Sequence, residues 1–474
     1  MNAARDIDIF INKFVKELEE ENAAIFAGAG LSISAGFVSW KGLLTPIAHA
    51  LGLNIDAETD LISIAQYHLN EKQSRSDLNQ ELIEQFSRGH VASDNHRILA
   101  RLPIKTYWTT NYDKLIEDTL TSVGKIPDVK YTVDQLKNTK PKRDALVYKM
   151  HGDIDHPDDA VLTKDDYERY SSTREPFATA LRGDLVSKTF LFLGFSFTDP
   201  NLDYILSRVR LSLQDKPRQH YCILKRPLRD EYPDDTTFQY ATLKLNLQIN
   251  DLKRFGVQTL QIERYEDLTA ILRRIEDRFR QRTIFISGAA HEYGDHTAAS
   301  AEEFIRNLSR EIILKDYKIV SGFGLGVGSH VITGVLQHIY ENNRQKLHDQ
   351  LLLRPFPQGE KGQETWEAYR KDMIGYAGVA IFLFGNKVDK DGKIVLSNGM
   401  HSEFEIAKAQ GLKLIPIGAT GYMAHELWEE INGNINAFYP GATDAFKAAF
   451  AELSDLKGNH IKAVITLLDI LKKE

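Results

Sequence analysis

The spacing of apolar residues along the first half of the chain predicts an α/β domain. A helix is predicted at the start by apolar residues that recur on one helical face: Ile7, Phe10, Ile11, Phe14 and Leu18. A short apolar run, 23–27, follows and ends at Gly28-Ala29-Gly30. A strand that stops at a glycine turn and then enters a helix is typical of the start of a nucleotide-binding unit.

Three later apolar runs also predict strands, and each ends in polar or small residues. They are 104–110 before Asn111, 145–150 before His151, and 189–193 before Gly194, while the region 51–99 has a helical pattern. The carboxyl ends of parallel strands meet at one edge of a sheet, where open α/β sheets hold their ligands. The sequence therefore predicts a ligand crevice that Asn111, His151 and Gly194 share.

The second half of the chain has its own alternation of strands and helices. A charged helix ends near Arg282 and a strand, 283–287, begins, so we predict two domains, 1–282 and 283–474. In the second, we expect a capping box at Ser300–Glu303, a glycine-rich loop at 322–328 and a helix that follows it to about 343. The other predicted elements are strands at 317–321, 351–355, 379–384 and 412–418, and helices at 365–376, 402–410 and 460–473. This order predicts two doubly wound, Rossmann-like domains.

Composition narrows the class of protein. The chain has 474 residues, of which 42% are hydrophobic and 26% charged, as in ordinary globular proteins. Its net charge of −7 disfavours a general nucleic-acid binder. The single cysteine, Cys222, excludes a disulfide within the chain and a zinc site built from clustered cysteines. The longest apolar runs are far shorter than the ~20 residues of a membrane span, and the N-terminus does not resemble a secretory signal. We expect a cytoplasmic protein that does not bind a membrane.

The glycine loop 28–32 is an incomplete nucleotide-binding motif. Its third glycine position holds Ile33, and no lysine and hydroxyl residue follow as in a P-loop. Taken alone, the loop could equally be a tight turn. Backbone N–H groups at such a turn suit a pyrophosphate. The interpretation of this loop as a ligand site therefore depends on its combination with the other strand ends.

Four motifs in this half of the chain, taken in order, resemble those of the sirtuin family. They are GAGLS at 28–32, TNYD at 110–113, HG at 151–152 and GFS at 194–196. The resemblance covers about the first 280 residues. It is strongest to the sirtuin-like domains of bacterial immune NADases, whose signature resembles 162–170 and 194–202. This resemblance implies that the domain cleaves the bond between nicotinamide and ribose in NAD+.

The resemblance also implies roles for single residues. Asn111 and His151 are the expected catalytic residues: the amide can orient the ribose or the attacking water, and imidazole exchanges protons near neutral pH. The expected NAD+ contacts are Gly28, Ala29, Gly30, Ser32, Asp113, Gly194, Ser196 and Asp199. Two other interpretations stay open: His151 as a hydrogen-bonded loop histidine, and Asp113 as an acid at a helix N-terminus.

One departure from the sirtuin pattern bears on the reaction. Sirtuin deacylases carry a zinc module of four cysteines, which a chain with only Cys222 cannot build. This puts the acyl-lysine groove in doubt and leaves water as the natural acceptor of the ribosyl cation. We therefore expect NAD+ hydrolysis, with NAD+ as substrate and with no metal and no further cofactor.

The second half resembles the SLOG family of nucleotide-binding domains, through the segments 286–290, 320–328, 369–374 and 402–407. Hydrolytic relatives carry a PGGxGT loop that this chain lacks, which favours ligand binding without catalysis. The expected binding residues are Gly288, Gly326, Gly328, Arg370, Lys387 and Glu403. Arg370 can bind a phosphate through two bonds, Lys387 can add a positive charge, and Glu403 can accept a ribose hydroxyl. The alternative is that Arg370 and Glu403 are solvated charges on helices.

A sirtuin-like NADase followed by a SLOG domain resembles the effectors of the Thoeris antiphage system. The resemblance implies that a separate TIR-domain protein makes a cyclic ADP-ribose isomer, which the second domain binds. The first domain then depletes NAD+, which causes abortive infection, and the protein forms a tetramer or a larger homo-oligomer. Two alternatives remain: an NAD-dependent protein deacylase and a non-catalytic nucleotide-binding regulator.

Overall fold

The computed structural model describes residues 3–87, 89–197, 199–213, 217–341, 350–357 and 364–472. The chain divides into two compact units, Met1–Glu276 and Asp277–Glu474. The division falls inside helix α13 (Tyr265–Arg280). The predicted boundary after residue 282 lies just beyond the end of this helix and stays a prediction.

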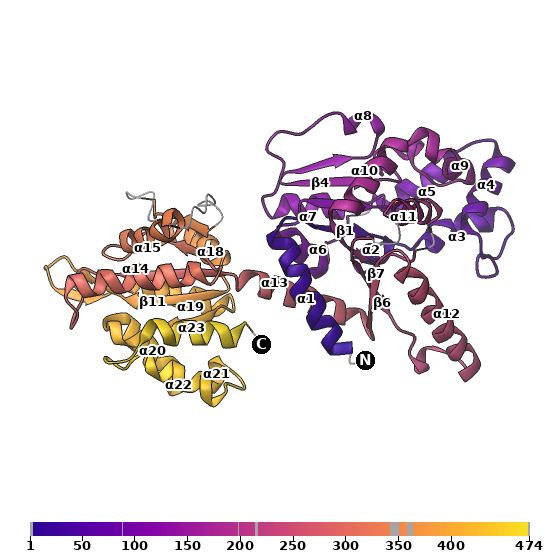
Figure 1. Ribbon diagram of the computed structural model, residues 1–474. Helices are drawn as coiled ribbons and strands as arrows, with labels where there is room; N and C mark the ends of the chain where they lie inside the picture. Colours follow the sequence, from indigo (N-terminus) through magenta and orange to yellow (C-terminus); the bar gives the residue numbers. More distant parts are fainter. Residues whose placement is uncertain are drawn as a thin grey trace. The chain divides into compact units, whose positions relative to one another are not determined.

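The first unit is built on a sheet of seven strands in the order β3-β4-β2-β1-β5-β6-β7, with every neighbouring pair parallel (Figure 1). The strands are β1 (Ala23–Ala27), β2 (Thr106–Thr109), β3 (Pro127–Lys130), β4 (Ala145–Lys149), β5 (Thr189–Leu193), β6 (His220–Lys225) and β7 (Val257–Ile262). The four strands that the sequence predicted are present. β3, β6 and β7 complete the sheet at its two edges.

Helices connect these strands, as parallel strand pairs require. Before β2 they are α1 (Ala3–Glu19), α2 (Ala29–Ile33), α3 (Trp40–Ala50), α4 (Leu61–Lys72), α5 (Ser76–Phe86) and α6 (Asp94–Arg101). After β2 they are α7 (Leu115–Ser122), α8 (Val133–Leu136), α9 (Lys164–Thr173), α10 (Glu175–Ser187), α11 (Pro200–Ser212), α12 (Asp235–Lys253) and α13. Short 3₁₀ turns lie at Pro157–Asp159 and Arg229–Glu231.

Alternate side chains of the central strands bury against helices on opposite faces of the sheet, as the two-residue period of a strand dictates. Phe26 of β1 and Phe192 of β5 stack with their ring centroids 5.2 Å apart, in a core shared with α10 and α11. On the other face, Phe10 of α1 packs against Tyr221 of β6 at 4.7 Å. The predicted first helix is therefore one of the layers that cover the sheet.

Helices α3, α4 and α5 form a smaller layer with its own apolar core. Its buried members include Leu44, Ile64 and Leu82, and the core also takes in Tyr112 from the loop after β2. The helical pattern predicted for 51–99 is thereby confirmed. This layer meets the loops at the carboxyl ends of the central strands, which is the edge where the sequence predicts a ligand.

The second unit contains a parallel sheet of five strands in the order β10-β9-β8-β11-β14. Its strands are β8 (Thr283–Ala289), β9 (Lys318–Ser321), β10 (Leu351–Leu353), β11 (Val379–Phe384) and β14 (Lys413–Pro416), and a hairpin pairs β12 (Asn386–Val388) with β13 (Ile394–Leu396). Its helices are α14 (Ala298–Leu314), α15 (Gly328–Glu341), α18 (Trp366–Gly375), α19 (Asn398–Ala409), α20 (Tyr422–Gly433), α21 (Ile435–Phe438), α22 (Asp444–Glu452) and α23 (His460–Leu471), with a 3₁₀ turn at Gly418–Thr420. Helices lie on both sides of this sheet, with α15 on one side and α20 on the other (Figure 1). The fold class, two Rossmann-like α/β domains, is confirmed.

Two helix starts in the second unit differ from the prediction. The capping box at Ser300–Glu303 is wrong: α14 begins earlier, because the Thr297 side chain caps it by accepting a hydrogen bond from the N–H of Ser300. Helix α19 begins at Asn398 after the cap Ser397, before the predicted start at residue 402. The predicted end of α15 near 343 lies outside the described residues, as does residue 473 at the end of the last predicted helix.

Among the residues that the structure describes, none of the helices combines the length and the apolar character that crossing a membrane requires.

Candidate active site

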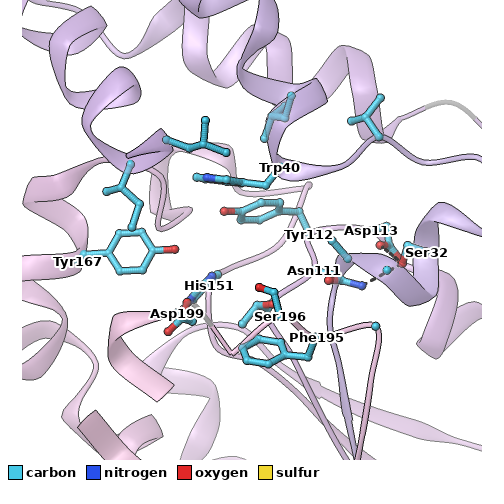
Figure 2. Close-up of a pocket in the computed structure, with 18 of the residues that line it drawn as sticks. Ser32, Trp40, Asn111, Tyr112, Asp113, His151, Tyr167, Phe195, Ser196 and Asp199 are labelled. Carbon is cyan, nitrogen blue, oxygen red and sulfur yellow. Dashed lines mark hydrogen bonds and ion pairs between the residues drawn. The ribbon is translucent and has the colours of Figure 1, made fainter. Parts of the chain in front are cut away.

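A cavity of about 590 Å³ lies at the carboxyl ends of the central strands of the first unit (Figure 2). Four strand ends contribute to it: the loop after β1 with Ala29, Gly30 and Ser32; the loop after β2 with Asn111 and Asp113; His151 after β4; and Gly194, Ser196 and Asp199 after β5. Gly28 belongs to the same loop but does not itself line the cavity. The convergence of separate strand ends is what the sequence predicted for this edge of the sheet.

The glycine loop packs directly on the turn after β5. A Cβ atom built on Gly28 would come within 2.5 Å of the Gly194 carbonyl oxygen, and one on Gly194, whose φ is +63°, within 2.1 Å of the Leu31 nitrogen. The N–H of Gly28 donates to the Leu193 carbonyl and that of Gly30 to the Gly194 carbonyl, both at 2.9 Å. These glycines therefore bring two turns together, and the N–H groups of Gly28 and Gly30 are already bonded.

The Asn111 amide is fixed by two donated hydrogen bonds. Its Nδ2 donates to the Gly28 carbonyl at 3.1 Å and to the Ser32 hydroxyl at 2.9 Å, with the amide orientation assigned from this network. Its own backbone N–H donates to Thr109 Oγ1 at 2.9 Å. Because both amide N–H groups are engaged, the side chain can offer a ligand only its oxygen, Oδ1.

Asp113 extends the hydrogen-bond network of Asn111 and Ser32. Its Oδ2 accepts from the Ser32 hydroxyl at 2.7 Å and its Oδ1 from the N–H of Leu115 at 3.0 Å, at the start of α7. Both carboxylate oxygens thus have protein partners, although the residue lines the cavity. The buried His96 interacts electrostatically with Asp113, yet burial, reinforced by the charge of Arg97, lowers the pKa of His96 to about 4.

His151 faces a buried carboxylate. Its Nε2 lies 3.2 Å from Oδ2 of Asp199, and its ring contacts Tyr167 edge-on with centroids 5.5 Å apart (Figure 2). Burial acts to raise the pKa of Asp199, but the charge of His151 and bonds from Leu202 and Asn201 outweigh it and lower that pKa. Burial and the Asp199 charge raise the pKa of Tyr167 well above its usual value. Asp199 and His151 are therefore best described as a carboxylate that orients an imidazole.

Aromatic residues that the sequence analysis did not single out line the other side of the cavity. Trp40 of α3 lies roughly parallel to Tyr112, with ring centroids 6.4 Å apart (Figure 2). Phe86 contacts Tyr112 edge-on. The cavity thus has a polar side, formed by the strand ends, and an aromatic side, formed by the helical layer. Stacking surfaces of this kind suit the rings of a nucleotide.

A buried cation that the sequence did not predict contacts the loop that carries Asn111. Lys149, the last residue of β4, is fully buried, and its ammonium contacts carbonyl oxygens of the loop that carries Asn111. It also pairs with the carboxylates of Glu117 and Asp153. A lysine in an alternating strand usually indicates a solvent-facing position, so no sequence signal pointed to this arrangement.

The second unit has a cavity of about 290 Å³ at the carboxyl ends of β8 and β9. Of the predicted residues, Gly288, Arg370 and Glu403 line it. The Arg370 guanidinium lies over the rings of Phe356 and Trp366, at 5.0 and 5.6 Å from their centroids, and its Nε is 3.5 Å from Glu403 Oε1.

Glu403 lies at the base of this second cavity. Its Oε2 accepts a hydrogen bond from the Ser287 hydroxyl at 2.6 Å. Burial raises the pKa of this carboxyl, against the opposing effects of Ser287 and Arg370. Arg370 and Glu403 are therefore not the solvated helix charges of the alternative interpretation.

The three other residues predicted for this site lie elsewhere. Gly326 and Gly328 do not line the cavity; their Cα positions pack against the Ala290 carbonyl and the Phe323 backbone, where a Cβ would not fit. Lys387 is exposed on the β12–β13 hairpin and does not line the cavity either. Contacts from these residues to a ligand stay predictions.

Within the described ranges, no group of three or more His, Cys, Asp or Glu side chains could hold a metal ion. His156 does not line the cavity; its Nε2 lies 2.8 Å from the Tyr131 hydroxyl.

Two family models match the chain, one to each half. Residues 105–246 match the SIR2-like domain, and residues 267–474 match the Sir2- and TIR-associating SLOG family. The first match contains Asn111, His151 and Asp199, and the second contains Arg370 and Glu403.

Curated relatives named NAD(+) hydrolase ThsA match over nearly the whole chain. An NAD(+) hydrolase ThsA of Bacillus cereus is 54% identical over 450 residues, which cover 95% of this chain and 94% of the relative. An NAD(+) hydrolase ThsA of Acinetobacter baumannii is 48% identical over 98% of each chain. A protein of Bacillus subtilis named defense-associated sirtuin 2 is 24% identical over 47% of this chain and 23% of its own length.

Proposed function

The chain belongs to the family of NAD(+) hydrolases named ThsA, and we propose that it cleaves NAD+ in the cavity of its first unit. One observation carries the assignment of the site: Asn111, held by two donated bonds, and His151, paired with Asp199, line the same cavity. The proposed reaction takes NAD+ and water to ADP-ribose, nicotinamide and a proton.

Asn111 guides the nucleophile in this proposal. Its Oδ1 accepts a hydrogen bond from the attacking water or from a ribose hydroxyl, because its N–H groups are bonded to Gly28 and Ser32. The glycosidic C–N bond breaks with its electron pair going to the pyridinium nitrogen, so nicotinamide leaves as a neutral molecule. The water oxygen then bonds to the ribose carbon, which carries positive charge in the transition state.

His151 takes the proton that the water loses. A hydrogen on Nε2, which faces Asp199, leaves Nδ1 as the nitrogen that can accept a proton. The Asp199 carboxylate stabilises the imidazolium that forms, and the proton then passes to solvent. No group in this scheme needs a Lewis acid, since the leaving group departs uncharged, and we expect chelating agents to leave the reaction unchanged.

The deacylase and regulator alternatives predict different outcomes. A deacylase would need an acyl-lysine peptide before it releases nicotinamide, and the single Cys222 opposes the zinc module of that class. A non-catalytic regulator would bind NAD+ without product. The presence of both Asn111 and His151 in one cavity favours catalysis over the non-catalytic regulator.

We further propose that the second unit controls this reaction. Its cavity offers a guanidinium for phosphate, the rings of Phe356 and Trp366 for a base, and Glu403 for a ribose hydroxyl. This chemistry suits a cyclic ADP-ribose isomer made by a TIR-domain protein during phage infection. Binding would activate a cytoplasmic homo-oligomer, a tetramer or larger, whose NAD+ depletion causes abortive infection.

The test is incubation of the full chain with NAD+, with and without cyclic ADP-ribose isomers, while nicotinamide and ADP-ribose are followed by chromatography. The proposal expects both products without any acylated peptide, and faster release with one of the isomers. Cleavage that requires a peptide would establish the deacylase. Binding of NAD+ without product under all conditions would establish the regulator.

A further inference from the structure

Lys149 connects the two strand ends that carry the proposed catalytic residues. It closes β4 two positions before His151, and its Nζ donates to the carbonyl oxygens of Tyr112 at 3.0 Å and Asp113 at 2.6 Å. These carbonyls belong to the two residues that directly follow Asn111. One ammonium group therefore spans from the β4 end to the β2 end.

The same ammonium is enclosed by carboxylates. The ammonium donates to Oε1 of Glu117 in α7 at 3.0 Å, and it also donates to Oδ2 of Asp153, which follows the His151-Gly152 pair. The side chain is fully buried. An ammonium has three N–H groups and here faces four oxygens, so no part of it is left for a ligand. This arrangement excludes a direct role for Lys149 in binding NAD+.

The charge on Lys149 is maintained by its partners. Burial acts to lower the pKa of Lys149, but the nearby carboxylates of Glu117 and Asp153 outweigh burial and raise it. Burial raises the pKa of Glu117, against the opposing charge of Lys149.

The Tyr112 carbonyl also accepts a hydrogen bond from the N–H of Ile154 at 3.1 Å, which joins the loop after β2 to the loop after β4.

We propose that Lys149 is a positioning residue for NAD+ cleavage: by binding the Tyr112 and Asp113 carbonyls and Asp153, it sets the separation between Asn111 and His151. This inference rests on the proposed function of the cavity. The effect is geometric, because two groups that act on one water must lie within about 0.5 Å of their productive positions. A loop displacement of about 1 Å commonly costs about 10²-fold in rate.

The chain provides a matched control in Lys130. This lysine ends the neighbouring strand β3 and is also buried, but it bonds to the Asn138 carbonyl and to Asp128, away from both catalytic loops. We expect Lys149→Met and Lys130→Met to lower the thermal stability of the full chain, since each removes a buried charge from its partners. Only Lys149→Met should lower kcat for nicotinamide release, by about 10²-fold.

A triple variant guards against a failure of Lys149→Met to fold. Lys149→Met combined with Glu117→Gln and Asp153→Asn leaves no uncompensated charge and preserves the shapes of the side chains. The inference expects this variant to fold and to keep the reduced kcat. Wild-type kcat in a folded triple variant would overturn it, as would equal losses of kcat in Lys149→Met and Lys130→Met.

A double-mutant cycle separates positioning from general destabilisation. If Lys149 acts through Asn111, Lys149→Met should reduce the residual activity of Asn111→Ala by much less than it reduces wild-type activity. Full additivity of the two losses would contradict the proposal.

Hydrogen exchange tests the inference without any activity. Amides of 111–115 and 152–155 should exchange at least about tenfold faster in Lys149→Met than in Lys130→Met, because only the first variant releases these loops. If wild type fails to cleave NAD+, the proposed function fails while this exchange result still decides whether Lys149 joins the loops. Unchanged exchange in both segments would reject the positioning role.

Discussion

The Asp199 carboxylate joins the start of a helix to His151. Its Oδ1 accepts the N–H of Leu202 and caps α11, while its Oδ2 lies 3.2 Å from Nε2 of His151. The position of the imidazole is therefore tied to a rigid element, which a loop residue alone could not provide.

Asp199→Asn should separate these two roles. The amide oxygen can still cap α11, but the charge that faces His151 is lost, so we expect kcat to fall about 10²–10⁴-fold with little change in thermal stability. Asp199→Ala should lower kcat similarly and also cost about 1 kcal/mol of stability, through loss of the cap. Steady-state kinetics and thermal unfolding of the two variants check this. Wild-type kcat in Asp199→Asn would remove the carboxylate from the mechanism.

Asn111→Ala and His151→Ala should each severely reduce the rate of NAD+ cleavage, to a small residual activity, while the fold stays intact. The first variant loses the oxygen that guides the water and the second loses the proton acceptor, and each such group typically contributes about 10²–10⁴ in rate. Nicotinamide release and circular dichroism of the purified full chain are the measurements. Near-normal turnover in either variant would exclude that residue.

Ser32→Ala should reduce kcat about tenfold or more, because the Ser32 hydroxyl bridges the Asn111 amide and the Asp113 carboxylate. Ser34→Ala is the matched control: its hydroxyl, two residues further along the chain, donates to the Leu31 carbonyl. Kinetics of both variants under the same activating conditions make the comparison. Equal activity of the two would show that the bridge does not matter for catalysis.

Stability should fall as the pH decreases from 7 toward 4. Burial, with the charge of Arg218, lowers the pKa of His220 to about 4, and the pKa of His96 is also about 4. Between pH 4 and the usual histidine pKa of 6.5, the unfolded chain binds protons that the folded chain does not. The stability that these two neutral histidines contribute is therefore fully present above pH 6.5 and is lost as the pH falls toward 4. Each histidine contributes about 1.4 kcal/mol per pH unit.

His220→Asn isolates one of these two contributions. The amide oxygen can replace Nδ1 as the acceptor for the N–H of Phe190 without titrating. The free energy of unfolding, measured with denaturant from pH 7 to 4.5, should depend less steeply on pH in this variant. The difference in slope should correspond to about one bound proton. An unchanged slope would mean that His220 is protonated in the folded chain over this range.

Arg370→Ala should remove activation by the cyclic nucleotide while basal NAD+ chemistry and the fold of the first unit are retained. Its guanidinium lines the second cavity between Phe356 and Trp366. Lys371→Ala is the control, because Lys371 is exposed and pairs with Glu367. Calorimetry should show weakened binding only for Arg370→Ala. Wild-type binding and response in that variant would place the sensor site elsewhere.

The sequence predicted the central strands well because their physical signal is local. Runs such as 23–27 and 189–193 are buried on both faces, so an uninterrupted apolar stretch was enough to mark them. The motifs at their ends placed Asn111 and His151 at one edge without any knowledge of packing. The start of α14 was missed because two hydroxyl residues, Thr297 and Ser300, are both plausible caps, and in the structure Thr297 takes this role by accepting the N–H of Ser300.

What escaped prediction depends on contacts distant in sequence. Lys149 contacts Tyr112, Asp113 and Glu117, which lie more than thirty positions away in the sequence. The residues next to Lys149 in the sequence do not indicate that its ammonium is buried. Lys387 was expected near a phosphate because of its charge, yet its place on a hairpin is set by the β12–β13 pairing. The aromatic side of the cavity was missed for the same reason, since Trp40 meets Tyr112 only through the packing of the helical layer.

The strand order has a consequence for how the protein is made. The site draws on β1, β2, β4 and β5, adjacent in the sheet, and its last component, Asp199, lies far along the first unit. A nascent chain still on the ribosome lacks the partner of His151 until that segment has emerged and α11 has formed. During synthesis, the proposed active site is therefore incomplete until the segment that carries Asp199 has been made and α11 has formed.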